Sequence, residues 1–262
     1  MEFGLKNKSA LVMASSSGLG KAIATELARE GANVMLFSPF VDQLKEAQAD
    51  IEKETGRKPE YFVGSITSAD DIKALVETTV EKCGPIYALV NNTGGPKPGV
   101  FDIFSDKDWQ DAYELCLLSY IRTIREVLPH MRANGGGRIV CSTSSSVKAV
   151  LDNLFLSNTF RLGVVGLAKT LSQELGKVNI LVNVIGPGRI GTARIDQLDA
   201  MRAQKVGVTV EEIQNETIKT IPLGRYGRPD EYGRLAAFLC SEANTFITGQ
   251  TVLLDGGMVK AF

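Results

Sequence analysis

Short apolar runs alternate with longer amphipathic stretches along this chain. The first run covers residues 9–15 (SALVMAS) and has the length and composition of a buried strand. Residues 20–31 follow it with Ile23 and Leu27 at helical spacing, and this stretch ends at Gly31, a residue that commonly terminates helices. The pattern therefore predicts a strand followed by an amphipathic helix.

The alternation continues to the end of the chain. Further helices are predicted over residues 41–54 and 68–83. Further strands are predicted over residues 32–37, 60–64, 87–92, 135–142, 177–186 and 251–255. Because such alternation is typical of βαβ units, the expected class is α/β, with a parallel sheet covered by helices on both faces. No repeat, low-complexity segment or Pro-rich linker interrupts it, so residues 1–262 are expected to form a single domain.

Residues 193–222 depart from this alternation. The segment is polar, has helical tendency and is long for a connection between a strand and the next helix. Long connections in compact domains are usually functional. We predict that residues 193–222 form a substrate loop or lid.

Composition and charge exclude several classes of partner. The chain has 29 basic and 30 acidic residues, for a net charge of −1, whereas a nucleic-acid-binding protein usually carries a basic surplus. No apolar stretch approaches the ~20 residues that cross a bilayer, and the N-terminal segment with its acidic Glu2 does not resemble a signal peptide. We expect a cytoplasmic protein with no nucleic-acid or membrane partner.

The cysteines and the single histidine do not suggest a metal site. The cysteines are Cys83, Cys116, Cys141 and Cys240, and no two of them form a Cys-x-x-Cys motif. A structural zinc site needs clustered ligands, so no metal is expected and the thiols should be reduced. His130 is expected on the surface, between a helix and a strand.

A glycine-rich turn follows the first predicted strand. In ASSSGLGKA, residues 14–22, Gly18, Leu19 and Gly20 open the first helix. The unpaired N–H groups and the positive end of the helix dipole can bind a pyrophosphate there, and glycine allows a close approach. The same turn can also serve packing alone, so by itself it leaves both interpretations open.

Later motifs raise the odds of nucleotide binding. They are NNTGG (91–95), GRIVCSTSS (137–145), GVVGLAKTLSQELG (163–176), NILVNVIGPGRIGT (179–192) and residues 222–257. In this order and spacing the chain resembles the short-chain dehydrogenase/reductase family over nearly its full length, most closely the 3-oxoacyl carrier-protein reductases and sugar dehydrogenases. The resemblance implies a Rossmann-type doubly wound parallel sheet and an NAD(P)-dependent oxidoreductase acting on a small alcohol or carbonyl, 3-oxoacyl compounds included.

The resemblance also implies a cofactor site and an oligomer. Residues expected to bind the cofactor are Ser16, Ser17, Gly18, Leu19 and Gly20 at the pyrophosphate, Ser65 and Ile66 at the adenine, Asn91 and Gly94 at the ribose, and Pro187, Gly188, Ile190 and Thr192 at the nicotinamide. Members of the family are usually tetramers. We expect a homotetramer or homodimer through the fourth and fifth helices, where Gly163, Gly166 and Ala168 permit close approach, with residues 251–257 as a second interface.

Two departures from the family's pattern concern the cofactor. The Thr-Gly that opens the family's glycine motif is replaced by Met13 and Ala14, which puts a Cβ where the chain bends tightly. At the end of the second strand, Ser38 and Pro39 carry neither the acidic charge that favours NAD nor the basic charge that favours NADP. The cofactor is expected to be NAD or NADP, bound weakly and with little discrimination.

The larger departure concerns catalysis. The family uses a Ser, a Tyr-x-x-x-Lys pair 13 residues later, and a helical Asn seven residues after a Trp. Ser144 fills the serine position, but Ser157, Arg161 and Cys116 stand where the Tyr, Lys and Asn belong. A serine hydroxyl is a far weaker acid than a phenol, and Arg161 can bond a ribose but cannot release a proton. Losing a general acid typically costs ~10²–10⁴ in rate.

Several alternatives remain for these positions. Tyr113, Cys116 and Tyr120 share one helical face, which could bring a phenol to the site, although a packing stripe is the favoured interpretation. Cys116 is either a buried apolar residue, which we favour, or a weak nucleophile. We therefore predict an oxidoreductase with an altered proton path. The rival hypothesis is a catalytically inactive member that binds a nucleotide or a partner protein.

Overall fold

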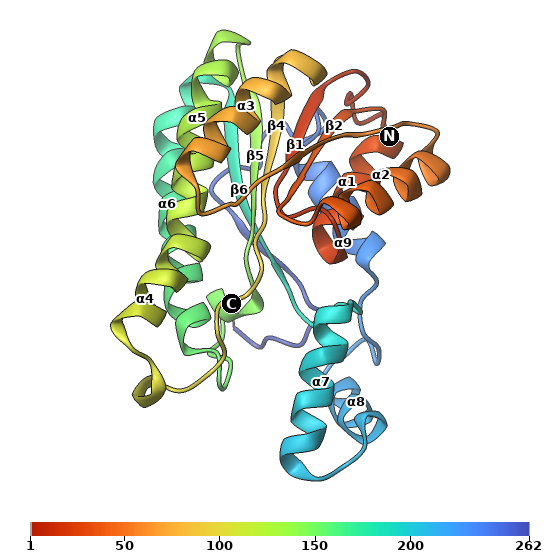
Figure 1. The fold of residues 1–262 in the computed structure, drawn as a ribbon, viewed down its shortest axis with the longest axis vertical. Helices are drawn as coiled ribbons and strands as arrows, with labels where there is room; N and C mark the ends of the chain where they lie inside the picture. The colour runs from red at the N-terminus through yellow and green to blue at the C-terminus, as the bar shows by residue number, and fades with distance from the viewer. Residues whose placement is uncertain (1, 262) are drawn as a thin grey trace.

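The strands that the apolar runs predict assemble into one sheet. The computed structural model describes residues 2–261, and within them seven parallel strands pair in the order β3-β2-β1-β4-β5-β6-β7 (Figure 1). Their bounds are Ser9–Val12 (β1), Asn33–Ser38 (β2), Glu60–Val63 (β3), Ile86–Asn91 (β4), Gly137–Ser142 (β5), Ile180–Pro187 (β6) and Thr251–Leu254 (β7). The predicted α/β class and Rossmann-type parallel sheet are confirmed.

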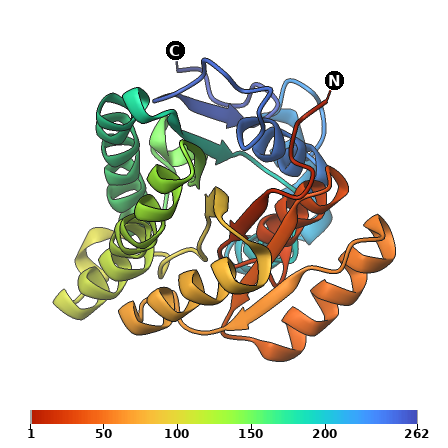
Figure 2. The same cartoon turned by 90° about the horizontal axis from the view of Figure 1, so that it is seen from above.

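Helices connect the strands and cover both faces of the sheet (Figure 2). Their bounds are Gly18–Arg29 (α1), Val41–Thr55 (α2), Ala69–Cys83 (α3), Asp106–Tyr113 (α4), Ser119–Ala133 (α5), Phe155–Leu175 (α6), Ala193–Val206 (α7), Val210–Lys219 (α8) and Pro229–Leu239 (α9). A π-helical segment, Glu114–Leu118, joins α4 to α5. No helix within residues 2–261 is long and apolar enough to span a membrane.

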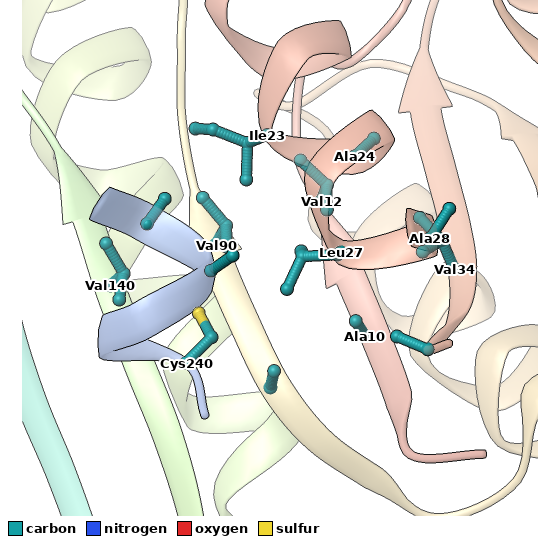
Figure 3. Close-up of a cluster of buried hydrophobic side chains, with 14 of the residues drawn as sticks. Ala10, Val12, Ile23, Ala24, Leu27, Ala28, Val34, Val90, Val140 and Cys240 are labelled. Carbon is teal, nitrogen blue, oxygen red and sulfur yellow. The ribbon is translucent and has the colours of Figure 1, made fainter. Parts of the chain in front are cut away.

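Alternating side chains of the central strands supply two separate cores. In β1, Ala10 and Val12 face α1, α2 and α9, whereas Leu11 faces α3, α5 and α6. The first of these cores, with Ile23 and Leu27 of α1 packed against the strands, is drawn in Figure 3. Both faces of the sheet are buried, which explains why its strands read as continuous apolar runs.

The sheet has its topological switch point between β1 and β4. The chain leaves β1 toward β2 and β3 on one side, and later returns to add β4 through β7 on the other. In open α/β sheets, ligands bind in the crevice at the carboxyl ends of the strands at this point. The fold therefore places the candidate site at the loops that follow β1, β4, β5 and β6.

The exceptional segment 193–222 forms a helical hairpin. Helices α7 and α8 project from the body of the molecule at one end (Figure 1). Thr209 begins α8 with a capping box, since its hydroxyl accepts from the Glu212 N–H while the Glu212 carboxylate accepts from the Thr209 N–H. The predicted helical tendency is confirmed, and the role as a lid or substrate segment stays a prediction.

One local prediction was wrong. His130 lies inside the last turn of α5 rather than between that helix and the next strand. Helix α5 continues through Pro129 to Ala133 because Val127 and Met131 bury their side chains against the sheet. Tertiary packing thus extends the helix beyond a residue that usually breaks one.

Candidate active site

The turn after β1 is tight because of its glycines. A Cβ added to Gly20 would lie 2.2 Å from the carbonyl oxygen of Ala14, and Gly18 has φ +54°, in the left-handed region. Ser17, the N-cap of α1, makes no side-chain hydrogen bond that caps the helix. The first-turn N–H groups of α1 thus remain open to an anion such as a pyrophosphate.

Ala14 keeps the turn in spite of its side chain. Its φ is +46°, a left-handed conformation that costs an alanine roughly 1–2 kcal/mol. The Asn92 side-chain amide donates to the Ala14 carbonyl oxygen (3.2 Å), which ties the loop after β4 to the turn after β1. The family's turn therefore survives the loss of its glycine, with some backbone strain.

The loops after β1, β4 and β6 meet around one space. A Cβ on Gly18 would lie 4.0 Å from the methyl carbon of Thr192, so the turn faces the segment that follows β6. Asn91 Nδ2 and Thr93 Oγ1 are buried and make no hydrogen bond of normal geometry to a described residue, although Thr93 lies near the Tyr120 hydroxyl and Asn91 near the Cys141 thiol. A Cβ on Gly94 would meet nothing within 4 Å. Buried polar atoms beside a tight glycine turn and open space fit a polar ligand such as a dinucleotide.

The end of β2 is polar but uncharged. The Ser16 hydroxyl can donate to Ser38 Oγ (3.0 Å) or to Gln43 Oε1 (3.1 Å). Ser38 Oγ also accepts from the Phe40 N–H (3.2 Å). Gln43 was not predicted, because it stands in the first turns of α2, outside the position that family comparisons emphasise. This network offers hydroxyls and an amide to a ribose, with no fixed charge that selects NAD or NADP.

The loop after β3 is held by its own polar contacts. The Ser65 N–H donates to Asp71 Oδ2 (2.7 Å), and the hydroxyls of Ser65 and Thr67 lie 2.9 Å apart. Arg122 of α5 donates to the Thr67 carbonyl oxygen (2.7 Å). Ser65 and Ile66 are thus fixed in position at the carboxyl edge of the sheet, where an adenine is expected.

The segment after β6 also depends on close backbone approach. A Cβ on Gly188 would lie 2.7 Å from the Cα of Asp255, and the Gly188 N–H donates to the Leu254 carbonyl oxygen (2.9 Å). Ile190 is buried, and Thr192 is the N-cap of α7. Pro187 through Thr192 therefore form an ordered wall opposite the glycine turn.

Arg161 stands at the floor of the crevice. It is 5% exposed, donating through Nη1 to the Ser142 carbonyl oxygen (3.4 Å) and through Nη2 to the Gly94 carbonyl oxygen (3.2 Å). These two bonds bring α6 against the end of β5 and the loop after β4. Among residues 2–261, no carboxylate forms an ion pair with Arg161, so its charge is buried without a counter-charge.

The two catalytic serine positions do not form a pair. Ser157 is buried one turn before Arg161, and its hydroxyl makes no hydrogen bond to a described residue. Ser144 Oγ instead accepts from the N–H of Ser146 (3.1 Å) at the start of a short 3₁₀ turn. Without a base or a partner that polarises it, neither hydroxyl is activated as a nucleophile or as an acid.

Cys116 lies in the π-helical segment and is fully buried. Burial raises the pKa of its thiol, and the nearby Arg161 charge only partly opposes this effect. A neutral, inaccessible thiol is a poor nucleophile, so the structure supports the interpretation of Cys116 as a buried apolar residue. The π-helical segment adds one residue to the turn, a feature frequent at functional sites.

Tyr120 belongs to the protein interior rather than to the crevice. It is fully buried, and its hydroxyl donates to the Ser142 carbonyl oxygen, the same acceptor that Arg161 uses. From the opposite face of the sheet, the Tyr232 hydroxyl lies 2.9 Å from Ser142 Oγ. Burial raises the pKa of both phenols above the ordinary value, which makes them weaker acids. The packing interpretation of Tyr120 is therefore supported.

Tyr113 packs in an aromatic cluster between α4 and α6. Its ring lies 6.1 Å from that of Phe160, within an aromatic cluster that includes Phe101, Trp109 and Phe155. The π-helical segment between α4 and α5 breaks the regular spacing that would have aligned Tyr113 with Cys116 and Tyr120. The structure thus gives Tyr113, Cys116 and Tyr120 packing contacts in the protein interior and the aromatic cluster.

Comparison with known proteins agrees with this arrangement. A family model described as "Enoyl-(Acyl carrier protein) reductase" matches residues 13–259. The 3-oxoacyl-[acyl-carrier-protein] reductase FabG of Thermotoga maritima is 32% identical over 257 residues, which cover 97% of this chain and 99% of that protein. The crystal structure of L-sorbose reductase from Gluconobacter frateurii, complexed with NADPH and L-sorbose, matches over 100% of both chains, with a TM-score of 0.95 and 31% identity.

A third protein extends the comparison to the other nicotinamide cofactor. A 7α-hydroxysteroid dehydrogenase, solved with NADH and 7-oxo glycochenodeoxycholic acid, has a TM-score of 0.90 and 30% identity, and the match covers 99% of this chain and 97% of that one. The sequence motifs, the switch-point crevice and these full-length similarities agree with one another. The chain belongs to the short-chain dehydrogenase/reductase family.

Proposed function

We propose that this protein is an NAD- or NADP-dependent oxidoreductase that acts on a small alcohol or carbonyl compound through an altered proton path. The observation that carries the proposal is the preserved cradle, by which we mean the tight glycine turn after β1 and the buried polar atoms of Asn91 and Thr93 beside it. The turn leaves no room for a Cβ at position 20. A chain that no longer bound a ligand there would gain by filling this space or by pairing these atoms.

The residues of the crevice suit the parts of a dinucleotide. Gly18 and the first turn of α1 would hold the pyrophosphate, and Ser16, Ser38 and Gln43 would bond ribose hydroxyls. The wall from Pro187 to Thr192 would border the nicotinamide. When bound, such a cofactor gives or takes a hydride at the carbonyl carbon of the substrate.

The residues around Arg161 can stabilise an oxyanion without supplying its proton. The guanidinium can donate hydrogen bonds to an oxyanion, while the Ser157 hydroxyl is a poor acid. Burial raises the pKa values of Cys116 and Tyr120, so neither side chain gives up a proton near neutrality. The proton would then come from water that enters beside the exposed Gly94. Turnover is expected to be slow.

A second candidate is a catalytically inactive member that binds a nucleotide or a partner protein. The observation in its favour is the simultaneous replacement of the family's Asn, Tyr and Lys by Cys116, Ser157 and Arg161. Titration with NADH and with NADPH by calorimetry, followed by a single-turnover assay with the cofactor that binds, separates the two. Cofactor binding without any hydride transfer to a panel of ketones would favour the second candidate.

The same titration tests the cofactor preference. Binding should be weak and should differ little between NADH and NADPH, because Ser38 and Pro39 carry no charge. Strong selectivity for one of them would show that a charge from another segment reaches this position.

We also propose a homodimer or homotetramer through α5 and α6. An apolar groove of about 380 Å³ runs between these helices and is lined by Ile121, Leu128, Pro129, Leu167 and Leu171 among others. Gly163 and Gly166 are exposed on the same helix α6 and permit close helix approach. Sedimentation at micromolar concentration should show an assembled species, and a monomer at every concentration would contradict the proposal.

A further inference from the structure

Two arginines without acidic partners flank the loop that follows β4. Arg161 reaches Gly94 from inside the molecule. Arg194, in the first turn of α7, reaches the next residue from outside, with Nη2 3.6 Å from where a Cβ on Gly95 would be. Neither guanidinium has an ion pair within the part of the chain that the structure describes. Adjacent backbone positions thus lie between two uncompensated positive charges.

Two other cations of this region are neutralised by carboxylates. Lys97, in the same loop, pairs with Asp108 (2.9 Å), and Arg189 pairs with the buried Asp199 (3.5 Å). Lys97 and Arg189 thus have carboxylate partners, whereas Arg161 and Arg194 have none within the described residues. This difference argues against a merely solvated, scattered set of surface charges.

The hydrogen bonding of Arg161 supports the same conclusion. Arg138 is equally buried at 5% exposure, and it donates to four carbonyl oxygens, those of Gly137, Asn179, Ser241 and Asn244. Arg161 donates to only two, although a guanidinium carries five N–H donors. Arg138 makes four structural bonds through Nε and Nη1, whereas Arg161 bonds only through Nη1 and Nη2 and leaves its Nε donor for a ligand.

The surroundings can accept a polar, anionic group. The buried Thr93 hydroxyl, one residue before Gly94, makes no hydrogen bond of normal geometry and lies near the Tyr120 hydroxyl. The positions where Gly94 and Gly95 would carry Cβ atoms are open apart from Arg194 itself. Carboxylates are bound best by a guanidinium that can offer parallel N–H groups, and Arg194 is exposed and free to do so.

We propose that the substrate of this oxidoreductase is an oxo or hydroxy acid, whose carboxylate binds to Arg194 beside Gly94 and Gly95 in the field of Arg161. The proposal rests on the proposed function and names its substrate class. Arg194 is the residue that distinguishes acids from neutral carbonyl compounds. Its position at the start of α7 means that the helical hairpin α7–α8 carries the specificity of the site.

The test compares acids with their neutral esters. Pyruvate, acetoacetate and levulinate, each beside its methyl ester, are titrated by calorimetry into the protein, with and without the cofactor that binds. The three acids place the carboxylate at different distances from the carbonyl. At least one acid should bind about tenfold or more tightly than its ester, because a charged hydrogen bond is lost in the ester.

Substitution of Arg194 locates the effect. Arg194→Gln should abolish the preference for the acid and leave ester binding unchanged, while Arg194→Lys should keep part of it. Arg202→Gln is the matched control, since Arg202 stands on the same helix and pairs with Glu216 of α8. It should leave the acid preference unchanged.

Two outcomes would overturn the proposal. One is equal binding of acid and ester throughout the series. The other is an Arg194→Gln variant whose affinity for NADH or NADPH falls while its acid preference persists, which would assign Arg194 to a cofactor phosphate. Absence of cofactor binding would instead overturn the proposed function, and the titrations without cofactor would still decide the anion site.

Discussion

The turn after β1 and the start of α6 lie at the same edge of the sheet, but they differ in how closely they match the family's motifs. The turn has lost one glycine and still closes, with Ala14 at φ +46°. Helix α6 carries Ser157 and Arg161 where the resemblance to the family implies a Tyr and a Lys, and Arg161 bonds backbone carbonyls. Ligand binding depends on backbone shape, which small residues preserve. Proton transfer depends on one acidic group, and our proposal is that no neighbour replaces it.

The contrast predicts that the proton path can be rebuilt on the existing cradle. In the triple variant Cys116→Asn, Ser157→Tyr and Arg161→Lys, reduction of simple ketones or 3-oxoacyl esters should rise by ~10²–10⁴, the usual contribution of a general acid. The measurement is cofactor oxidation, followed by the loss of absorbance of the reduced nicotinamide. The double variant that keeps Ser157 is the control and should show no such gain.

An unchanged rate in the triple variant, with the fold confirmed by circular dichroism, would contradict this contrast. It would mean that the crevice no longer seats the nicotinamide productively. The second candidate, an inactive nucleotide- or protein-binding member, would then be favoured.

A change in the glycine turn should weaken cofactor binding while residues 116, 157 and 161 stay as they are. Gly20→Ala places a Cβ 2.2 Å from the Ala14 carbonyl oxygen, so the turn must open and destabilise the fold by about 1–3 kcal/mol. Affinity for NADH or NADPH should fall by about tenfold or more in calorimetry. Gly176→Ala, where a Cβ meets nothing within 4 Å, is the control and should leave the affinity unchanged.

Ala14 offers a test with a gain in stability. Ala14→Gly should raise the free energy of unfolding by about 0.5–1 kcal/mol, because relief of the left-handed strain exceeds the extra entropy of a glycine in the unfolded chain. Urea denaturation should show a higher midpoint at constant m-value. Ala200→Gly, inside helix α7, should instead lower the midpoint. A lower midpoint for Ala14→Gly would show that the turn is relaxed with alanine.

The smallest effect is expected at Ser157. Ser157→Ala should leave any native activity within a few-fold, since the hydroxyl has no hydrogen-bond partner that activates it. Steady-state kinetics with the cofactor that binds provide the measurement. A loss of ~10²–10⁴ would identify Ser157 as the proton donor and would remove the distinction between the two regions.

Much of the fold could be predicted from the sequence because its signals are local. Each strand is a short apolar run, and each of the first helices carries an amphipathic pattern and a stop signal such as Gly31. Boundaries differ by a few residues where a turn intervenes. The first strand, for example, ends at Val12 because Ala14 already turns the chain. The motifs after β4, β5 and β6 placed the candidate cofactor residues at one edge of the sheet.

The contacts around Ser142 could not be predicted. Tyr232 follows Ser142 by 90 residues, and it approaches from the other face of the sheet. Arg161 could be aligned with the family's lysine, but its carbonyl partners depend on how α6 packs. Arg194 appeared only as one charge in a polar segment, and its place beside Gly95 requires the folded hairpin. Side-chain chemistry at long sequence separation has no periodic pattern.

The π-helical segment Glu114–Leu118 sets the rotational phase between α4 and α5. Each residue of an α-helix turns the chain by about 100°, so deletion of a single residue there would rotate α4 about its axis relative to everything that follows. The aromatic rings that contact α6, Trp109 and Tyr113, would leave Phe160, while Tyr120 would keep its place under β5. The extra residue of the π-helical segment therefore sets the orientation of Trp109 and Tyr113 independently of the orientation of Tyr120.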